Sequence, residues 1–216
     1  MEKISQLTST KAVQGTSGEH LCLRVKPKLI PLFYQLLGHG FSVNIQTGVS
    51  VKDLLCKQLG IHEDYLAQRI QSVFLNASVV DDVTSAIVHD GSTLALSGAM
   101  PGLVGAILRS GGFYAAMRSQ ISYGDSRPSS PQTTGRITLK LLNLIVKELG
   151  PTFLQQGIWI KGQELLDFMT RNSTVLEGGC LSSELGNKPL APDSLRKLDW
   201  KTELVFLKVV GSSQPE

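Results

Sequence analysis

The sequence predicts an α+β fold of two tandem units, and three observations support this expectation. Hydrophobic residues make up 42% of the 216-residue chain and charged residues only 18%, as in globular proteins with packed cores. Residues 122–135 form a polar stretch with two prolines and two glycines, which is typical of a linker. On both sides of this stretch, alternating apolar patterns of strands occur together with the spacing of helices. We therefore expect one unit over 20–121 and a smaller one over 136–216.

The predicted N-terminal unit follows a tail, residues 1–19, which is polar and lacks the apolar run of a signal peptide. Strand-like alternation marks 21–25 and 41–45, and residues 50–59 place Val51, Leu54, Leu55 and Leu59 on one helical face. Short strands are expected at 73–76 and 79–80. Asp90-Gly91 predicts a turn that leads into a strand at 93–96.

An apolar segment, residues 101–121, extends this unit. Pro101 suits the first turn of a helix, and Gly111-Gly112 is expected to interrupt the helix before Phe113. One interpretation is an extra pair of helices that covers a bare sheet face. The other is a surface for a protein partner or for self-association, because Phe113, Tyr114 and Met117 are of residue types that are enriched at interfaces. The candidate surface residues are Leu103, Ile107, Phe113, Tyr114 and Met117.

The predicted C-terminal unit repeats this pattern. It has strand signals at 137–141 and 157–160, a helix after Gly162 and a final strand at 202–210. Corresponding elements of the two units lie at similar offsets, 137 − 21 = 116, 158 − 43 = 115 and 204 − 94 = 110. An internal duplication is the simplest explanation of these offsets.

Three segments, 74–82, 89–98 and 137–150, resemble β-grasp proteins, the ubiquitin-like fold. Within that fold they are similar to the sulfur carriers of molybdopterin and thiamine synthesis. The first matches a strand, an asparagine-containing turn and a strand; the second a turn and last strand; the third an opening strand and a helical turn. The resemblance implies two tandem β-grasp units that dock a protein partner without catalysis.

A sulfur carrier is the alternative that the resemblance implies, and it requires a C-terminal Gly-Gly with a free carboxylate. The chain departs from this pattern, because Gly111-Gly112 is internal and the sequence ends in Gly211-Ser-Ser-Gln-Pro-Glu216. Cleavage after Gly112 or after Gly179 would be needed to expose such a terminus.

The three cysteines, Cys22, Cys56 and Cys180, are odd in number and far apart, which favours reduced thiols and a cytoplasmic location. Cys180 follows two glycines and is the candidate reactive thiol. An enzyme that uses Cys56 or Cys180 with a histidine is a further alternative. His20 and Cys22 would share a strand face and could join Cys56 at a metal. We favour packed thiols, and expect no metal, no cofactor and no catalytic residues.

Charge and hydropathy restrict the partners further. Lysine and arginine total 21 and aspartate and glutamate 18, so the net charge is only +3, which predicts no nucleic-acid partner. Residues 92–117 contain one charge, Arg109, yet glycines and Pro101 argue against a membrane span. His39, His62 and His89 lie beside turn signals and are expected to be exposed. The sequence thus predicts a non-catalytic binding module whose partner is a protein or a second copy of the chain.

Overall fold

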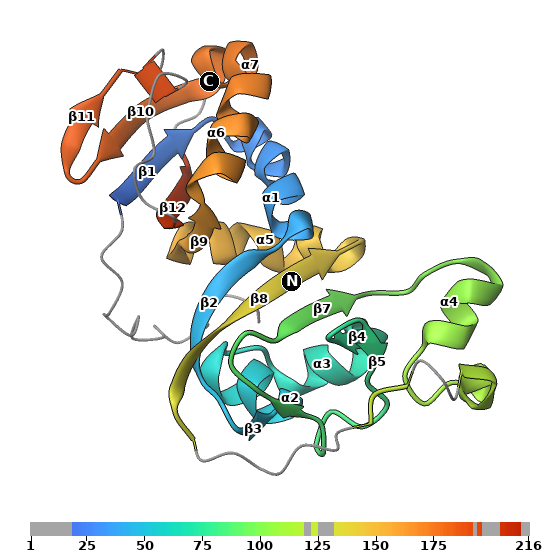
Figure 1. Cartoon of the computed structure of the whole chain (residues 1–216). Coiled ribbons are helices and arrows are strands. Elements are labelled where there is room, and N and C mark those ends of the chain that lie inside the picture. Colours follow the sequence, from blue (N-terminus) through green and yellow to red (C-terminus); the bar gives the residue numbers. More distant parts are fainter. Residues whose placement is uncertain (1–18, 119–121, 125–131, 192–193, 196–203, 213–216) are drawn as a thin grey trace. The chain divides into compact units, whose positions relative to one another are not determined.

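A computed structural model describes residues 19–118, 122–124, 132–191, 194–195 and 204–212 (Figure 1). The fold is α+β, as the sequence predicts. Two compact units divide the chain: unit 1 contains residues 43–145, and unit 2 contains the described residues of 15–42 and 146–216. The chain therefore passes from one unit to the other twice, once within strand β2 (Phe41–Gln46) and once within helix α5 (Leu144–Gln156).

The sheet of unit 1 has the strand order β2-β8-β7-β4-β5. Its central pair, β7 (Thr93–Ser97) and β8 (Thr134–Leu142), is parallel, and β4 (Ser72–Leu75) pairs antiparallel with β7 and with β5 (Ser78–Val79). Alternate residues are buried along these strands, as in the row Leu75, Leu94 and Leu139 across three strands. One face of the sheet is thus the core of the unit.

Helical segments cover that core. The segments α2 (Val51–Asp53), the π-helical η2 (Leu54–Gln58) and α3 (Glu63–Arg69) bury Val51, Leu54, Leu55 and Leu66. Ser50 begins α2, because its side chain accepts a hydrogen bond from the amide of Asp53. A small ladder of β3 (Val49–Ser50) and β6 (Ile87–Val88), the helix α4 (Gly102–Leu108) and the 3₁₀ segment η3 (Phe113–Arg118) complete the unit.

The sheet of unit 2 is also mixed. It has the order β11-β10-β1-β12-β9, and Ser42, at the start of β2, pairs antiparallel with Trp159 of β9. Strand β1 (Glu19–Val25) runs parallel to β12 (Leu204–Gly211). The neighbours β10 (Cys180–Leu185) and β9 (Ile158–Lys161) are antiparallel to this pair, and β11 (Lys188–Leu190) pairs with β10. The row Leu21, Leu207 and Ile158 is buried.

The helical elements of unit 2 are η1 (Pro27–Phe33), α1 (Tyr34–His39), part of α5, α6 (Gly162–Arg171) and α7 (Ser173–Gly179). Their apolar side chains fill the core. Phe33 of η1 and Phe168 of α6 are in ring contact at 5.1 Å between centroids, and Phe153 of α5 contacts Phe41 of β2 at 5.3 Å. The helix predicted after Gly162 is α6, which buries Leu165, Phe168 and Met169. Strand-like segments predicted from alternation are found as strands. The sequence did not predict the helical segments η1, α1, α3 and α7 or the strands β3, β6, β10 and β11.

The units meet at 42/43 and 145/146, and not at the predicted linker 122–135. The opening strand of the predicted N-terminal unit, β1, pairs with β12, and the opening strand of the predicted C-terminal unit, β8, pairs with β7. Both pairings are parallel, and parallel strands are joined by long crossover connections rather than by hairpins. Such partners are remote in sequence, so a reading along the chain does not reveal them.

Candidate functional site

The apolar extension predicted at 101–121 is found as α4 and η3 in unit 1, and Figure 1 shows α4 standing clear of the strands of its own unit. Large apolar side chains are exposed on it, led by Phe113, at 91%, and Met117, at 71%. We call the following set the α4–η3 surface: Leu103, Val104, Phe113, Tyr114 and Met117. The fifth candidate from the sequence, Ile107, is only part-exposed.

The α4–η3 surface is attached to unit 1 by hydrogen bonds around one turn. The amide of Ser110 donates to the carbonyl of Gln71 at 2.9 Å, and its hydroxyl donates to the carbonyl of Val80 at 2.7 Å. The hydroxyl of Ser72, in β4, donates to the carbonyl of Leu108 at 2.8 Å. Because three separate bonds fix the end of α4, the extension is anchored to the sheet at this turn.

A buried ion pair makes a second attachment. The side chain of Arg118 is 0% exposed and forms an ion pair with Asp81, which also accepts a hydrogen bond from the amide of Gly111 at 3.1 Å. The guanidinium further donates to the carbonyls of Ile107, at 3.4 Å, and Arg109, at 3.2 Å. Arg118 thereby joins η3, the end of α4 and the segment after β5, because a guanidinium has five donors in a fixed plane.

Gly111 and Gly112 form the turn between α4 and η3. Gly111 has φ +63°, a conformation that other residues adopt at a cost, and the amide of Gly112 donates to the carbonyl of Arg109. The interruption predicted from these glycines is confirmed. Their place in an ordered turn accounts for them without a role in cleavage.

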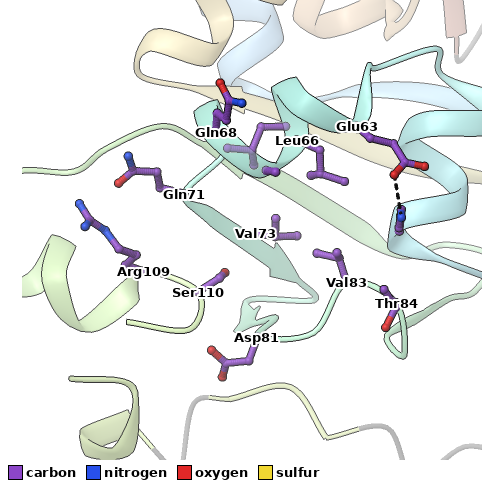
Figure 2. Close-up of a pocket in the computed structure, with 13 residues that line it drawn as sticks. Glu63, Leu66, Gln68, Gln71, Val73, Asp81, Val83, Thr84, Arg109 and Ser110 are labelled. Atoms are coloured by element: carbon purple, nitrogen blue, oxygen red, sulfur yellow. Dashed lines mark ion pairs between the residues drawn. The ribbon is translucent and has the colours of Figure 1, made fainter. Parts of the chain in front are cut away.

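A pocket of about 540 Å³ lies beside this turn, within unit 1. Figure 2 shows α3 on one side of it, β4 on its floor and the Arg109–Ser110 turn at one end. Its apolar lining comes from Leu66, Ile70, Val73 and Val83. The volume lies within the range of pockets that bind small ligands.

The rim of the pocket is polar and mixed in charge. Lys52 and Glu63 form an ion pair at 2.9 Å, and this pairing raises the pKa of Lys52. Asp81 and Arg109 lie on the rim at the other end, where Arg109 extends away from the apolar floor (Figure 2). An apolar floor surrounded by side chains of both charges is typical of a recognition surface for a protein segment rather than of a phosphate site.

Two of the cysteines, Cys56 and Cys180, have thiol pKa values shifted upward. Burial raises the pKa of the Cys180 thiol, and a backbone hydrogen bond at Ser182 opposes this effect only in part. Burial likewise raises the pKa of Cys56, and Glu63 adds to this effect. A raised pKa reduces the thiolate fraction at neutral pH, whereas catalytic cysteines need it lowered.

The second glycine pair, Gly178-Gly179, ends α7. A Cβ atom on Gly179 would lie 2.1 Å from Cδ1 of Leu29, and the carbonyl of Gly179 accepts the amide of Lys26 at 2.9 Å. A larger residue at this position would therefore displace the Leu29 side chain.

The candidate metal ligands fall in separate elements, His20 and Cys22 in β1 and Cys56 in η2. Among the residues that the structure describes, no group of three or more histidines, cysteines, aspartates and glutamates is placed to hold a metal. In the same residues, none of the helices has the length and hydropathy needed to cross a bilayer.

The expectation that all three turn histidines are exposed is wrong for His89, which is 8% exposed. Its amide donates to the hydroxyl of Ser92 and its carbonyl accepts the amide of Ser92, so a tight turn holds it inside. His39 and His62 are exposed, and the imidazole of His62 accepts the amide of Asp64 at the start of α3.

Sequence reasoning missed Arg118, Asp81 and Val104 at this site. Nothing in the sequence connects Asp81 with Arg118, which lies 37 positions later. Val104 carries the same helical spacing as Leu103 and could have been included with it.

No family model, no curated protein and no solved structure matches the chain.

Proposed function

We propose that the protein is a non-catalytic binding module, and that the α4–η3 surface is where a protein partner docks. The observation that carries the proposal is the exposure of Phe113, at 91%, together with Leu103, Val104 and Met117, each above 60%. Contiguous exposed apolar side chains of this size mark interaction sites more often than ordinary surface.

The attachment of the surface supports docking. Ser110, Asp81 and Arg118 fix the turn between α4 and η3 and the end of η3. The rings of Phe113 and Tyr114 pack edge to face at 5.2 Å. A surface that is already ordered loses less conformational entropy on association than a free segment does. The pocket next to the Arg109–Ser110 turn adds a depression that side chains of a partner can enter.

Docking on side chains is favoured over addition of a strand to a sheet edge. Ser122 and Tyr123 already bond Val79, on the edge strand β5 of unit 1. The side-chain amide of Gln58 bonds the backbone of Gln46 in β2. Its oxygen accepts from the N–H of Gln46 at 2.8 Å, and its nitrogen donates to the C=O of Gln46 at 3.0 Å. In unit 2 the edge strand β11 contains Lys188 and Pro189, residue types that discourage strand addition.

We propose further that the units are of β-grasp type. The support in unit 1 is a mixed sheet with a central parallel pair, β7 and β8, and with helical segments over one face. In this proposal the opening strands of the two units are exchanged along the chain.

The binding proposal is tested by replacing Phe113 and Tyr114 by serine together. We expect loss of the complex with the partner and unchanged folding, because both side chains are exposed. The matched control is Val175→Ser, an exposed apolar residue of α7 in unit 2. Cross-linking in native cells, followed by mass spectrometry, measures the complex. Equal complex formation by the double variant and the wild type would overturn the proposal.

A further inference from the structure

The sheet of unit 2 has one buried face and one exposed face. Leu21, Leu207 and Ile158 are at most 2% exposed, whereas the residues that alternate with them are partly or fully exposed. Because side chains alternate between the faces of a strand, the register of the pairs defines what the outer face carries.

Three rings lie side by side on this outer face. His20 in β1 is paired with Phe206 in β12, and Phe206 is paired with Trp159 in β9. The ring centroids are 5.0 Å apart for His20 and Phe206, 5.1 Å for Phe206 and Trp159, and 5.7 Å for His20 and Trp159. Each ring thus contacts the other two, so the cluster is ordered before any ligand arrives.

The absence of a side chain at Gly157 leaves space for the Phe206 ring. A Cβ atom on Gly157 would lie 2.1 Å from Cζ of Phe206. The Phe206 ring therefore lies close against the main chain before β9. His20 is exposed, and Trp159 and Phe206 are part-exposed.

Cations flank the rings on both sides. Lys161 is two residues after Trp159 on β9 and is paired with Leu204, and Lys208 is two residues after Phe206 on β12 and is paired with Cys22. Arg24 follows two residues after Cys22 on β1. In the part of the chain that the structure describes, no ion pair engages these three side chains. Glu184, paired with Cys22, is the acid that the described strands place on this face.

We propose that this face binds single-stranded nucleic acid, with bases stacked on His20, Phe206 and Trp159 and phosphates against Lys161, Lys208 and Arg24. Ring faces accept any base, and lysine and arginine neutralise the backbone, which is how sheet faces bind single strands. Three cations against one carboxylate disfavour a cationic ligand in an aromatic cage.

The expectation of no nucleic-acid partner follows from the net charge of the whole chain. A net charge does not show whether cations gather on one face of a sheet. The corresponding face of unit 1 gives a contrast, because its row Phe74, Ala95 and Lys140 contains a single aromatic ring. The two units therefore bury similar apolar faces but expose different side chains.

Fluorescence anisotropy tests the proposal on the full-length protein, with labelled oligouridine and oligothymidine of about ten nucleotides. We expect binding with a dissociation constant of about 10⁻⁶ to 10⁻⁴ M, and a logarithmic salt slope of about −2 for three phosphate contacts. Equal affinity for both probes assigns the site to single strands in general, and tighter binding of oligouridine assigns it to RNA; both results support the proposal.

Variants separate stacking from charge. Trp159→Ala should lower the association constant at least about fivefold, and Trp159→Phe should retain most of it, because a ring remains. Lys161→Glu with Lys208→Glu should abolish binding at moderate salt. The matched control is Lys188→Glu, an exposed lysine whose partner Leu185 alternates with Glu184 and so faces the other way. Circular dichroism confirms that each variant is folded.

Three results would overturn the proposal. They are no binding of either probe well above the expected range, equal or tighter binding of a duplex of the same sequence, and binding that depends on the lysines but not on Trp159. The first would leave the face to a protein partner, and the last would make it a general anion site.

Discussion

Unit 1 and unit 2 bury the same kind of sheet face and differ in what they expose. In unit 1 the row Leu75, Leu94 and Leu139 faces the core, and in unit 2 the row Leu21, Leu207 and Ile158 does so. Each unit has a central parallel pair of strands. Unit 1, however, carries an apolar extension, α4 and η3, whereas unit 2 carries a face of rings and cations.

The difference indicates where function lies. Buried rows are set by packing and can be alike in units that do different things. Exposed apolar or aromatic side chains contribute little to folding, so their presence favours a role in binding. We therefore assign protein docking to the extension of unit 1 and nucleic-acid binding to the outer face of unit 2, as separate proposals.

The largest expected effect comes from dividing the chain at 127/128, within the predicted linker. Residues 1–127 alone lack β8, the neighbour of β7, and residues 128–216 alone lack β1, the neighbour of β12. We expect each fragment to be unfolded alone and to fold when the two are co-expressed, with NMR dispersion as the measurement. A well-dispersed spectrum from either fragment alone would favour the tandem division instead.

Matched core substitutions compare the two units next. Leu94→Ala and Leu207→Ala each remove a side chain that is 0% exposed between two buried neighbours. Each should lower the free energy of unfolding by about 2–5 kcal/mol, as loss of buried leucine does elsewhere. Urea titration measures both. A change below about 1 kcal/mol for one of them would show that its row is not part of a tightly packed core.

The attachment of the extension is tested by Asp81→Asn. The Arg118 guanidinium would lose its carboxylate partner, but Asp81 is 40% exposed, so water would replace part of the interaction. We expect a loss of about 1–3 kcal/mol, with faster hydrogen exchange over 102–118. Asp82→Asn is the matched control, because asparagine can still accept the bonds from Thr84. Equal exchange in both variants would contradict a role for Arg118 in attachment.

Thiol reactivity distinguishes a binding module from a cysteine enzyme. Burial raises the pKa of Cys180 and Cys56, so less thiolate is present at pH 7 and more forms as pH rises. We expect both to react with iodoacetamide several times more slowly in the folded protein than in urea, where the pKa returns toward its ordinary value. Peptide mass spectrometry resolves each site. Faster alkylation of Cys180 in the folded protein than in urea would instead support the cysteine enzyme.

The smallest effect on stability should come from the proposed docking residues. Phe113→Ser and Met117→Ser change side chains that are 91% and 71% exposed, so the free energy of unfolding should change by less than about 0.5 kcal/mol. Thermal unfolding checks this value. A clear loss of stability would mean that these side chains pack within the molecule.

Local patterns in the sequence predict most of the strands and little of their pairing. Alternation marks β1, β8 and β12 because one face of each is buried, and Gly111 marks the turn after α4 because it needs a positive φ. The exchange of β1 and β8 depends on contacts between residues far apart in the chain, which periodicity does not encode.

The same limit applies to the sites. Exposed apolar residues of α4 and η3 follow from helical spacing, and four of the five predicted surface residues are exposed. The pairing of Arg118 with Asp81 and the gathering of His20, Trp159 and Phe206 require the folded sheets, because their positions are separated by long stretches of chain.

The most direct test of the binding proposal is photo-cross-linking in native cells from benzoylphenylalanine placed at Phe113, with the same group at Val175 as a control. We expect one covalent adduct with a defined protein, or with a second copy of the chain, from position 113 only. Replacing Leu103 and Met117 by serine should abolish it. No adduct from position 113, or the same adducts from both positions, would contradict docking on the α4–η3 surface.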